Sequence, residues 1–310
     1  MSRMSRMIRM MRRMITWAAS FLRSPLTRAA APPARLRTLL VTGAAGHVAS
    51  CLRPGLREMF PRLRLVDIRP VANLAPVEEF MRADLSAPGV AERAVAGVDA
   101  IVHLAAVAKE APFEMLHDAN IIATYNLFEA ARRQGVRRIV FTSTMHVMGF
   151  YRRDEPFDEQ SPLRPDSRYA VSKAFGEALA RLYADKHGLR VVCLRIGHLM
   201  PTEDEAEPGN WASPEDLLSL VRIGLEHPDL RFEVFHVIAN YEGAPVRMSS
   251  ATRYGFVPRR PTETFARTLA RARSAWPSDS VAQMSQGATF ASAEYSGAPH
   301  ESPVDLKTNS

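Results

Sequence analysis

The amino-acid sequence predicts an α/β protein built on a doubly wound parallel sheet. From Arg37 onward, short apolar runs alternate with longer amphipathic stretches, the pattern of strands and helices that alternate along a chain. The first apolar run leads directly into the small-residue stretch VTGAAGHVAS, residues 41–50, where a strand would give way to a helix. With 310 residues, of which 46% are hydrophobic, the chain can bury a sizeable core.

Five apolar runs predict buried parallel strands, because strands covered on both faces contain few polar residues. These runs are LRTLLVT (36–42), LRLVD (63–67), DAIVHLA (99–105), RRIVFTS (137–143) and LRVVCLRIG (189–197). Residues 118–135 and 167–188 predict amphipathic helices that end at glycines. The buried side of the first helix is expected to hold Ile121, Tyr125, Leu127 and Phe128.

The alternation loosens after Gly197, where one helix (214–226) and one strand (232–237) are expected. We therefore divide the chain into four parts. They are a disordered basic extension (1–36), a dinucleotide-binding Rossmann-type domain (37–197), a small C-terminal substrate-binding cap packed on it (198–297) and a disordered tail (298–310).

The basic charge of the chain is concentrated at its start. Residues 1–38 contain nine arginines and no acidic residue, so the rest has 31 basic against 33 acidic residues. This near-neutral remainder argues against nucleic-acid binding. The apolar run at 14–22 is too short to span a membrane. The segment is interpreted as a misplaced translation start, a transit peptide, a twin-arginine export signal or a basic tail without function, and the protein as cytoplasmic unless it is targeted.

The glycine-rich turn predicts a site for NAD. Gly43, Gly46 and Ala49 would let the backbone contact a pyrophosphate, together with His47 and Val48 at the start of the following helix. Asp67 ends the second predicted strand, where a carboxylate accepts hydrogen bonds from the ribose hydroxyls of NAD and repels the 2′-phosphate of NADP. Arg69 is the alternative, since its guanidinium could instead bind that phosphate.

Three further residues predict a proton-transfer site at the same edge of the sheet. Tyr169 and Lys173 are four residues apart, hence on one face of a helix, and a lysine ammonium favours the ionised form of a nearby tyrosine. Thr144 ends the fourth predicted strand, where its hydroxyl could hold the reacting oxygen. Cys51 and Cys193 form no cluster, and no metal site is predicted.

These motifs resemble the extended short-chain dehydrogenase/reductases of the NAD-dependent epimerase/dehydratase superfamily. Within that group, residues 37–297 look most like uronate dehydrogenase. The matching pieces are TGAAG, VD (66–67), ADL (83–85), HLAA (103–106), NIIATYNLFEAAR, FTSTMHVMG, RPDSRYAVSKAFGE, LRIG and QGATFASAEYSG.

The resemblance implies NAD-dependent oxidation of a sugar acid at its anomeric carbon, with catalytic roles for Thr144, Tyr169 and Lys173. Family analogy also suggests a homo-oligomer. The implied cofactor residues, besides those of the turn, are Asp67, Ile68, Asp84, Leu85, Leu104, Ala105, Ala106, Asn120, Thr142, Lys173 and Ile196. The implied substrate residues are Ala108, Thr144, Met145, His146, His198 and Phe290.

The substrate pocket departs from the family pattern. Ala108, Met145 and His198 stand where the family has serine, asparagine and serine. The family also binds the substrate carboxylate with an arginine in a loop that here reads HLMPTEDEAEPGNW (198–211), which is acidic and has no arginine. A bidentate arginine contributes ~2–4 kcal/mol to such binding. We therefore expect low activity on glucuronate and galacturonate, unless Arg222 or Arg247 supplies the charge.

The sequence thus predicts an NAD-dependent oxidoreductase that removes a hydride from a hydroxyl of a small sugar or sugar acid, with an altered carboxylate clamp. One alternative is an NAD-dependent sugar epimerase or dehydratase, which shares the cofactor motifs but needs a larger, basic cap. A dinucleotide-sensing protein without catalysis would be expected to lose Tyr169 or Lys173, and both are present.

Overall fold

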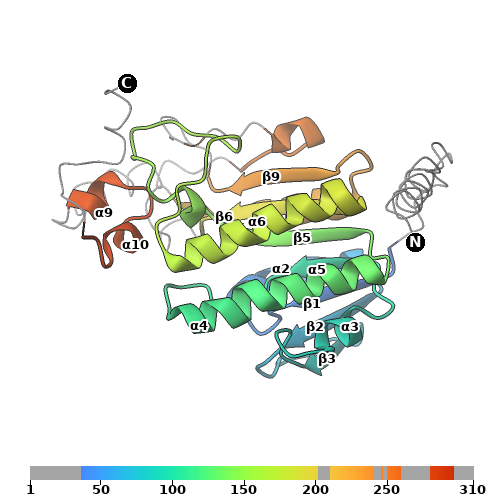
Figure 1. Cartoon of the computed structure of the whole chain (residues 1–310). Coiled ribbons are helices and arrows are strands. Elements are labelled where there is room, and N and C mark those ends of the chain that lie inside the picture. The colour runs from blue at the N-terminus through green and yellow to red at the C-terminus, as the bar shows by residue number, and fades with distance from the viewer. Residues whose placement is uncertain (1–35, 202–209, 240–245, 247–249, 260–279, 297–310) are drawn as a thin grey trace, which may run out of the picture. The chain divides into compact units, whose positions relative to one another are not determined.

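The protein is built around a seven-stranded parallel sheet (Figure 1). The computed structural model describes residues 36–201, 210–239, 246, 250–259 and 280–296. The order of the strands in the sheet is β3-β2-β1-β4-β5-β6-β9, and every neighbouring pair is parallel. Their bounds are β1 Thr38–Thr42, β2 Arg62–Asp67, β3 Glu78–Arg82, β4 Ala100–His103, β5 Arg138–Thr144, β6 Arg190–Ile196 and β9 Phe232–Val237. The predicted doubly wound α/β fold is confirmed.

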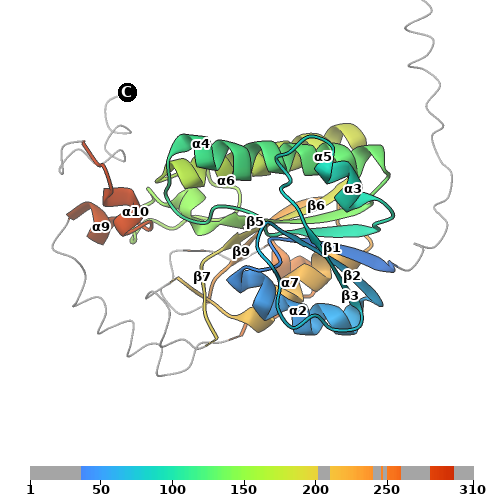
Figure 2. The ribbon, with the colours of Figure 1, turned by 90° about the horizontal axis from the view of Figure 1, so that it is seen from below.

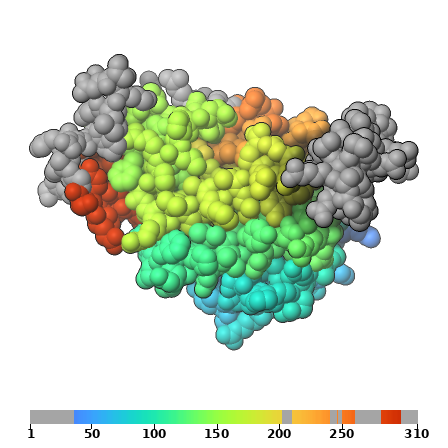
Figure 3. Space-filling view, viewed as in Figure 1, coloured from blue at the N-terminus to red at the C-terminus, as the bar shows by residue number. Residues whose placement is uncertain are grey.

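Helices cover both faces of this sheet, which is why its central strands β1, β4, β5 and β6 are buried along almost their whole length (Figure 2). One face carries α2 (His47–Met59) and α7 (Pro214–Glu226), which share an apolar core with β1 and β6. The other carries α3 (Val90–Val95), α5 (Ala123–Arg133) and α6 (Arg168–His187). In the space-filling view α5 and α6 run side by side across the front (Figure 3).

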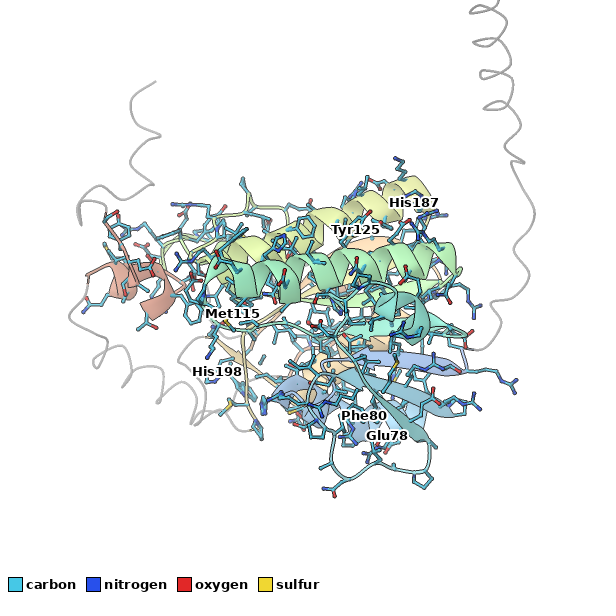
Figure 4. All side chains as sticks on the ribbon, turned by 60° about the horizontal axis from the view of Figure 1, so that its bottom comes forward. Glu78, Phe80, Met115, Tyr125, His187 and His198 are labelled. Atoms are coloured by element: carbon cyan, nitrogen blue, oxygen red, sulfur yellow. The ribbon has the colours of Figure 1, made fainter. Side chains whose placement is uncertain are left out.

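The five predicted strands are present, and the edge strand β3 is one that the apolar pattern did not indicate. Three of its five residues, EEFMR, are charged, and Glu78 is buried by ion pairs rather than by apolar contact (Figure 4). Both Arg53 and Arg57 donate two hydrogen bonds to the Glu78 carboxylate. Burial alone would raise the pKa of Glu78, but these hydrogen bonds lower it to about 2.

The helix predicted over 118–135 is a π-helical turn followed by a regular helix, and a further short helix precedes it. A short α4 (Phe113–Leu116) leads into a π-helical turn (His117–Ile122), which continues as α5. Leu127 and Phe128 are fully buried as expected. The expectation that Tyr125 is buried is wrong, since this side chain is 46% exposed on the outer side of α5 (Figure 4). Tyr125 and Leu127 both lie within the regular α5, two residues and hence about 200° apart around the helix axis, so they cannot share one face.

Several short elements lie beyond the carboxyl ends of the strands. They are a 3₁₀ turn at Met145–Met148, the paired strands β7 (His198–Leu199) and β8 (Trp211–Ala212), α9 (Ser280–Met284) and α10 (Thr289–Ser292). A second 3₁₀ turn, Ala251–Tyr254, lies instead beside the amino end of β9, where Tyr254 donates a hydrogen bond to Glu233. The region 198–297 also supplies β9 and α7, which complete the main sheet and one of its faces.

Some expectations concern residues outside those described. They are the ones on the extension up to residue 35, on the acidic positions 202–209, on Arg247 and on the tail from residue 297. Among the described residues, no helix combines the length and hydropathy needed to span a bilayer.

Candidate active site

The turn between β1 and α2 is shaped to bring backbone close to a ligand. Gly43 has φ +68, and a Cβ there would lie 2.6 Å from the backbone nitrogen of Ala105, so only glycine fits. Gly46 precedes α2 without a side-chain cap, and His47 and Val48 begin the helix. The first N–H groups of an uncapped helix are free to bind an anion, so this cradle fits the pyrophosphate of a dinucleotide.

Asp67 lies beside this turn at the end of β2, as the sequence predicts. Its Oδ2 accepts a hydrogen bond from the backbone of Ala45 (2.9 Å), and its Oδ1 accepts one from the backbone of Arg69 (2.8 Å). Each carboxylate oxygen retains a further lone pair for a ribose hydroxyl. The Arg69 side chain donates to the carbonyl of Ala45 (3.2 Å), which places the guanidinium over the turn. Ile68, between them, is 60% exposed.

The segment after β4 forms the opposite wall of the turn. Thr42 Oγ1 accepts hydrogen bonds from the backbone of Leu104 and Ala105 (both 3.2 Å) and lies 2.7 Å from Nδ1 of the fully buried His103. Burial, and then the charge of Lys173, lowers the pKa of His103 to about 3, so this ring is neutral. His103 is therefore a structural group that ties the ends of β1 and β4 together.

Asn120 links the segment after β4 to α6 by hydrogen bonds. In the π-helical turn, its side chain exchanges hydrogen bonds with the backbone of Val107 (2.8 and 3.1 Å) and donates to Ser172 Oγ (2.8 Å). Ser172 in turn donates to the carbonyl of Tyr169. Asn120 thus holds the backbone of Val107 and, through Ser172, that of Tyr169 in place. The matching motif alone does not reveal this structural role. The other candidate cofactor positions follow strand ends or occupy them: Asp84, Leu85, Ala106, Thr142 and Ile196.

Thr144 and Tyr169 meet at the carboxyl edge of the sheet, between β5 and the first turn of α6. Both side chains are nearly buried, at 4% and 7% exposure. Burial raises the pKa of Tyr169 to about 12, while a hydrogen bond with Thr144 acts in the opposite direction and the charge of Asp166 adds to the rise. Lys173 makes no contribution to this shift, so the lowering of the Tyr169 pKa expected from the lysine is not found.

Lys173 lies one turn further along α6 and is 4% exposed. Its Nζ is 4.6 Å from the ring centre of Phe141, a cation–π contact. Burial lowers the pKa of Lys173 to about 8. The lysine thus titrates close to neutral pH at the same site as Tyr169.

Two of the candidate substrate residues, His146 and Phe290, make ring contacts with Tyr169, and the others lie outside these ring contacts. His146, Phe290 and Tyr169 form one aromatic cluster, in which His146 and Phe290 stack with ring centres 4.1 Å apart. Met145 is buried beside them, while Ala108 is exposed on the segment after β4. His198, on β7, is half-buried (Figure 4).

Arg222 does not reach this cluster, so the expectation that it could supply the missing charge is wrong. It is exposed on α7 near Gly224, whose carbonyl accepts a hydrogen bond from Arg138 at the start of β5. That is the amino edge of the sheet, opposite to Thr144.

A buried polar network beside the candidate catalytic residues was not identified from the sequence. Glu177 accepts two hydrogen bonds from Arg195 (2.9 and 2.8 Å) and one from Ser143, the neighbour of Thr144. Arg195 also lies 3.3 Å from Nε2 of His236. Burial, and then the charge of Arg195, lowers the pKa of His236 to about 3. These groups are contributed by three strands and α6, so no local pattern could have indicated them.

Comparisons with known proteins agree with this geometry. Residues 39–210 match the NAD dependent epimerase/dehydratase family. A uronate dehydrogenase from Pseudomonas putida is 38% identical over 260 residues, which is 82% of this chain and 95% of that protein. An L-arabinose 1-dehydrogenase (NAD(P)+) from Haloferax volcanii is 31% identical over 249 residues, 71% of this chain and 96% of that protein.

The fold is also similar to solved structures. A uronate dehydrogenase variant from Agrobacterium tumefaciens, complexed with NAD, superposes with a TM-score of 0.77 at 36% identity and covers 83% of this chain and 97% of that one. The match over more than half of the chain, the sheet order and the glycine turn lead to one conclusion. The chain belongs to the NAD-dependent epimerase/dehydratase family and is an NAD-dependent dehydrogenase similar to uronate dehydrogenases.

Proposed function

We propose that the protein oxidises the anomeric hydroxyl of a small sugar acid to a lactone, with NAD as the hydride acceptor. The observation that carries the proposal is the meeting of Thr144 and Tyr169 at the strand edge that also holds the glycine turn. The similarity to uronate dehydrogenases over most of the chain supports the class of substrate.

In the proposed reaction Thr144 holds the oxygen of the C1 hydroxyl and Tyr169 removes its proton. Bound NAD supplies the nicotinamide ring that accepts the hydride from C1. Lys173, with a pKa of about 8, is largely protonated at neutral pH and can hold the ribose next to the nicotinamide. The turn at Gly43 would bind the pyrophosphate of the cofactor, and the carboxylate of Asp67 would bind its adenosine ribose; together they orient the cofactor.

A neutral aldose is the second candidate substrate, and one feature favours it. Residues 198–212 contain four acidic residues and no lysine or arginine, so this segment offers a carboxylate no cation. The similarity to an L-arabinose 1-dehydrogenase is consistent with a neutral sugar. An epimerase or dehydratase reaction is the third candidate function. It differs in its products, because such enzymes return the hydride from the cofactor to the sugar and release no NADH.

A substrate screen tests these proposals. Purified protein and NAD are incubated with uronates, neutral aldoses, polyols and nucleotide-linked sugars, and NADH is followed by absorbance. We expect NADH with free sugar acids, in contrast to the low uronate activity expected from the acidic segment 198–211, because the similarity to uronate dehydrogenases covers most of the chain. NADH with neutral sugars alone would move the protein to the second candidate, and conversion of a nucleotide-linked sugar without NADH would move it to the third.

A further inference from the structure

The Lys173 ammonium is buried without a hydrogen-bond acceptor in the described part of the chain. The side chain is 4% exposed, and the contact that its Nζ makes is with the face of the Phe141 ring, 4.6 Å from the ring centre. Taking an ammonium out of water without a partner is costly, and burial accordingly lowers the pKa of Lys173 to about 8. The charge of this group therefore depends on its immediate neighbours.

The acids near this ammonium do not compensate its charge. Cys193 on β6 and Glu177 on α6 act to raise the pKa of Lys173, but burial outweighs them. Glu177 accepts two hydrogen bonds from Arg195, so its negative charge is already paired. Burial raises the pKa of the Cys193 thiol well above its ordinary value, which leaves the thiol neutral.

Two further titratable groups lie around Lys173, and both are neutral. Tyr169 is one turn earlier on α6 and has a pKa of about 12, raised by burial. His103 on β4 has a pKa of about 3, lowered by burial and then by the charge of Lys173 itself. Neither group supplies a negative charge at neutral pH, which leaves the Phe141 ring as the neighbour that can favour the ammonium.

The Phe141 ring is held in place by α6, α5 and β4. Gly176 lies three residues after Lys173, hence on the same face of α6, and a Cβ there would lie 2.2 Å from Cζ of the ring. Only glycine lets the ring lie this close to the helix. Phe128 packs edge-on against the ring with 6.3 Å between ring centres, and His103 lies at 5.8 Å. The ring therefore has a defined position against the ammonium.

An aromatic face differs from a carboxylate in how it stabilises a cation. Its partial negative charge attracts the ammonium without accepting a directed hydrogen bond. A carboxylate at the same place would also stabilise the charge but would occupy N–H donors of the lysine. The contact with Phe141 thus leaves these donors available to a ligand, and the hydroxyls of a ribose are acceptors of the required kind.

We propose that Phe141 is a positioning residue for the cofactor: its ring stabilises the charged form of Lys173 in the free protein and so keeps the ammonium available to donate to the ribose next to the nicotinamide of NAD. The consequence for oxidation of a sugar acid rests on the function proposed above. The interaction between the ring and the ammonium does not depend on that function.

The first test measures the pKa of Lys173 in the protein without cofactor or sugar. The chain contains four lysines, so protein labelled with 13C at lysine Cε gives few NMR signals, and Lys173→Met identifies the one that belongs to Lys173. Phe141→Leu removes the aromatic face, and we expect the pKa of Lys173 to fall by roughly one pH unit. Phe141→Met, whose flexible side chain adapts to the space of the ring, is a second variant that should show the same fall.

Phe128→Leu is the matched control. Phe128 is fully buried, loses the same atoms on substitution and contacts the Phe141 ring rather than Lys173. The titration midpoint of Lys173 should therefore stay at its wild-type value in this variant. An unchanged midpoint in both Phe141 variants would overturn the proposal. An equal fall in Phe128→Leu would also overturn it, because lost core packing would then explain the effect.

The second test follows the binding of NADH, whose nicotinamide ring is uncharged, by fluorescence at several pH values. A fall of roughly one unit leaves Lys173 charged in wild type and Phe141→Leu at about pH 6, but mostly neutral in the variant at about pH 8. We expect the dissociation constant of Phe141→Leu to be close to that of wild type at about pH 6 and roughly threefold to fivefold higher at about pH 8. A purely structural defect would weaken binding by the same factor at every pH.

A ratio of dissociation constants that does not change with pH would therefore overturn the role of Phe141 toward the cofactor. Phe128→Leu should give such a constant ratio. Neither test uses a sugar, so a protein that oxidises no sugar acid would refute the proposed function, while the pKa and the NADH affinities would still decide the role of Phe141.

Discussion

Replacing Gly43 with alanine tests the cofactor cradle, and Gly97 provides a control with the same backbone conformation. Gly43 has φ +68 and Gly97 has φ +69, so alanine meets a similar backbone strain of roughly 1–2 kcal/mol at both. A Cβ at Gly97 meets nothing within 4 Å, whereas one at Gly43 would lie 2.6 Å from backbone of Ala105. This crowding adds roughly 1–3 kcal/mol at Gly43 only.

We therefore expect Gly43→Ala to lower the free energy of unfolding by roughly 2–5 kcal/mol and Gly97→Ala by no more than roughly 1–2 kcal/mol. Relief of the clash moves the turn away from Ala105, so Gly43→Ala should also weaken NAD binding by at least about tenfold, while Gly97→Ala should not. Urea unfolding and calorimetric titration with NAD measure the two effects. Equal destabilisation in both variants with wild-type NAD affinity would refute the account of the cradle.

Three further predictions concern the candidate site. Tyr169→Phe should lower kcat by at least ~100-fold while NAD still binds, and near-normal turnover would exclude Tyr169 as the proton acceptor. Asp67→Ala should weaken NAD binding and reduce the preference for NAD over NADP, measured as the ratio of kcat/KM with NAD to kcat/KM with NADP. If the wild-type protein already prefers NADP, Arg69 rather than Asp67 determines the choice of cofactor. Because the pKa of Lys173 is about 8 in the folded chain against 10.5 ordinarily, the unfolded state binds more protons between these values. The unfolding free energy should rise with pH across that window, and Lys173→Met should remove that part of the rise; an identical pH dependence in both proteins would contradict the lowered pKa.

The sequence predicted those elements that depend on residues close together in the chain. Buried parallel strands are continuous apolar runs, and the glycine turn and the Tyr169/Lys173 spacing are short-range signals, so these elements could be located directly. The edge strand β3 could not, because Glu78 is buried by two arginines from α2 rather than by apolar neighbours. The exposure of Tyr125, by contrast, follows from regular helix geometry, because residues two apart, such as Tyr125 and Leu127, lie on opposite sides of α5.

The candidate site shows the same division between local and long-range information. The residues Thr144 and His146 follow one strand and could be assigned from a motif. Asp166 could not be linked to His146, because that contact depends on Gly149 and on Gly287 far along the chain. The missing arginine could be read from the sequence, whereas the contact between Asp166 and His146 appears only in the three-dimensional arrangement.

Transfer of deuterium from the substrate tests the central claim most directly. Glucuronate labelled with deuterium at C1 is incubated with the protein and NAD, and the reduced cofactor is analysed by mass spectrometry. Oxidation of the anomeric hydroxyl predicts one deuterium on the nicotinamide ring for each lactone formed, and no transfer in Tyr169→Phe above ~1% of the wild-type rate. Reduced cofactor without deuterium, or no reduced cofactor from any free sugar acid, would contradict the proposal that the protein oxidises a sugar acid at C1.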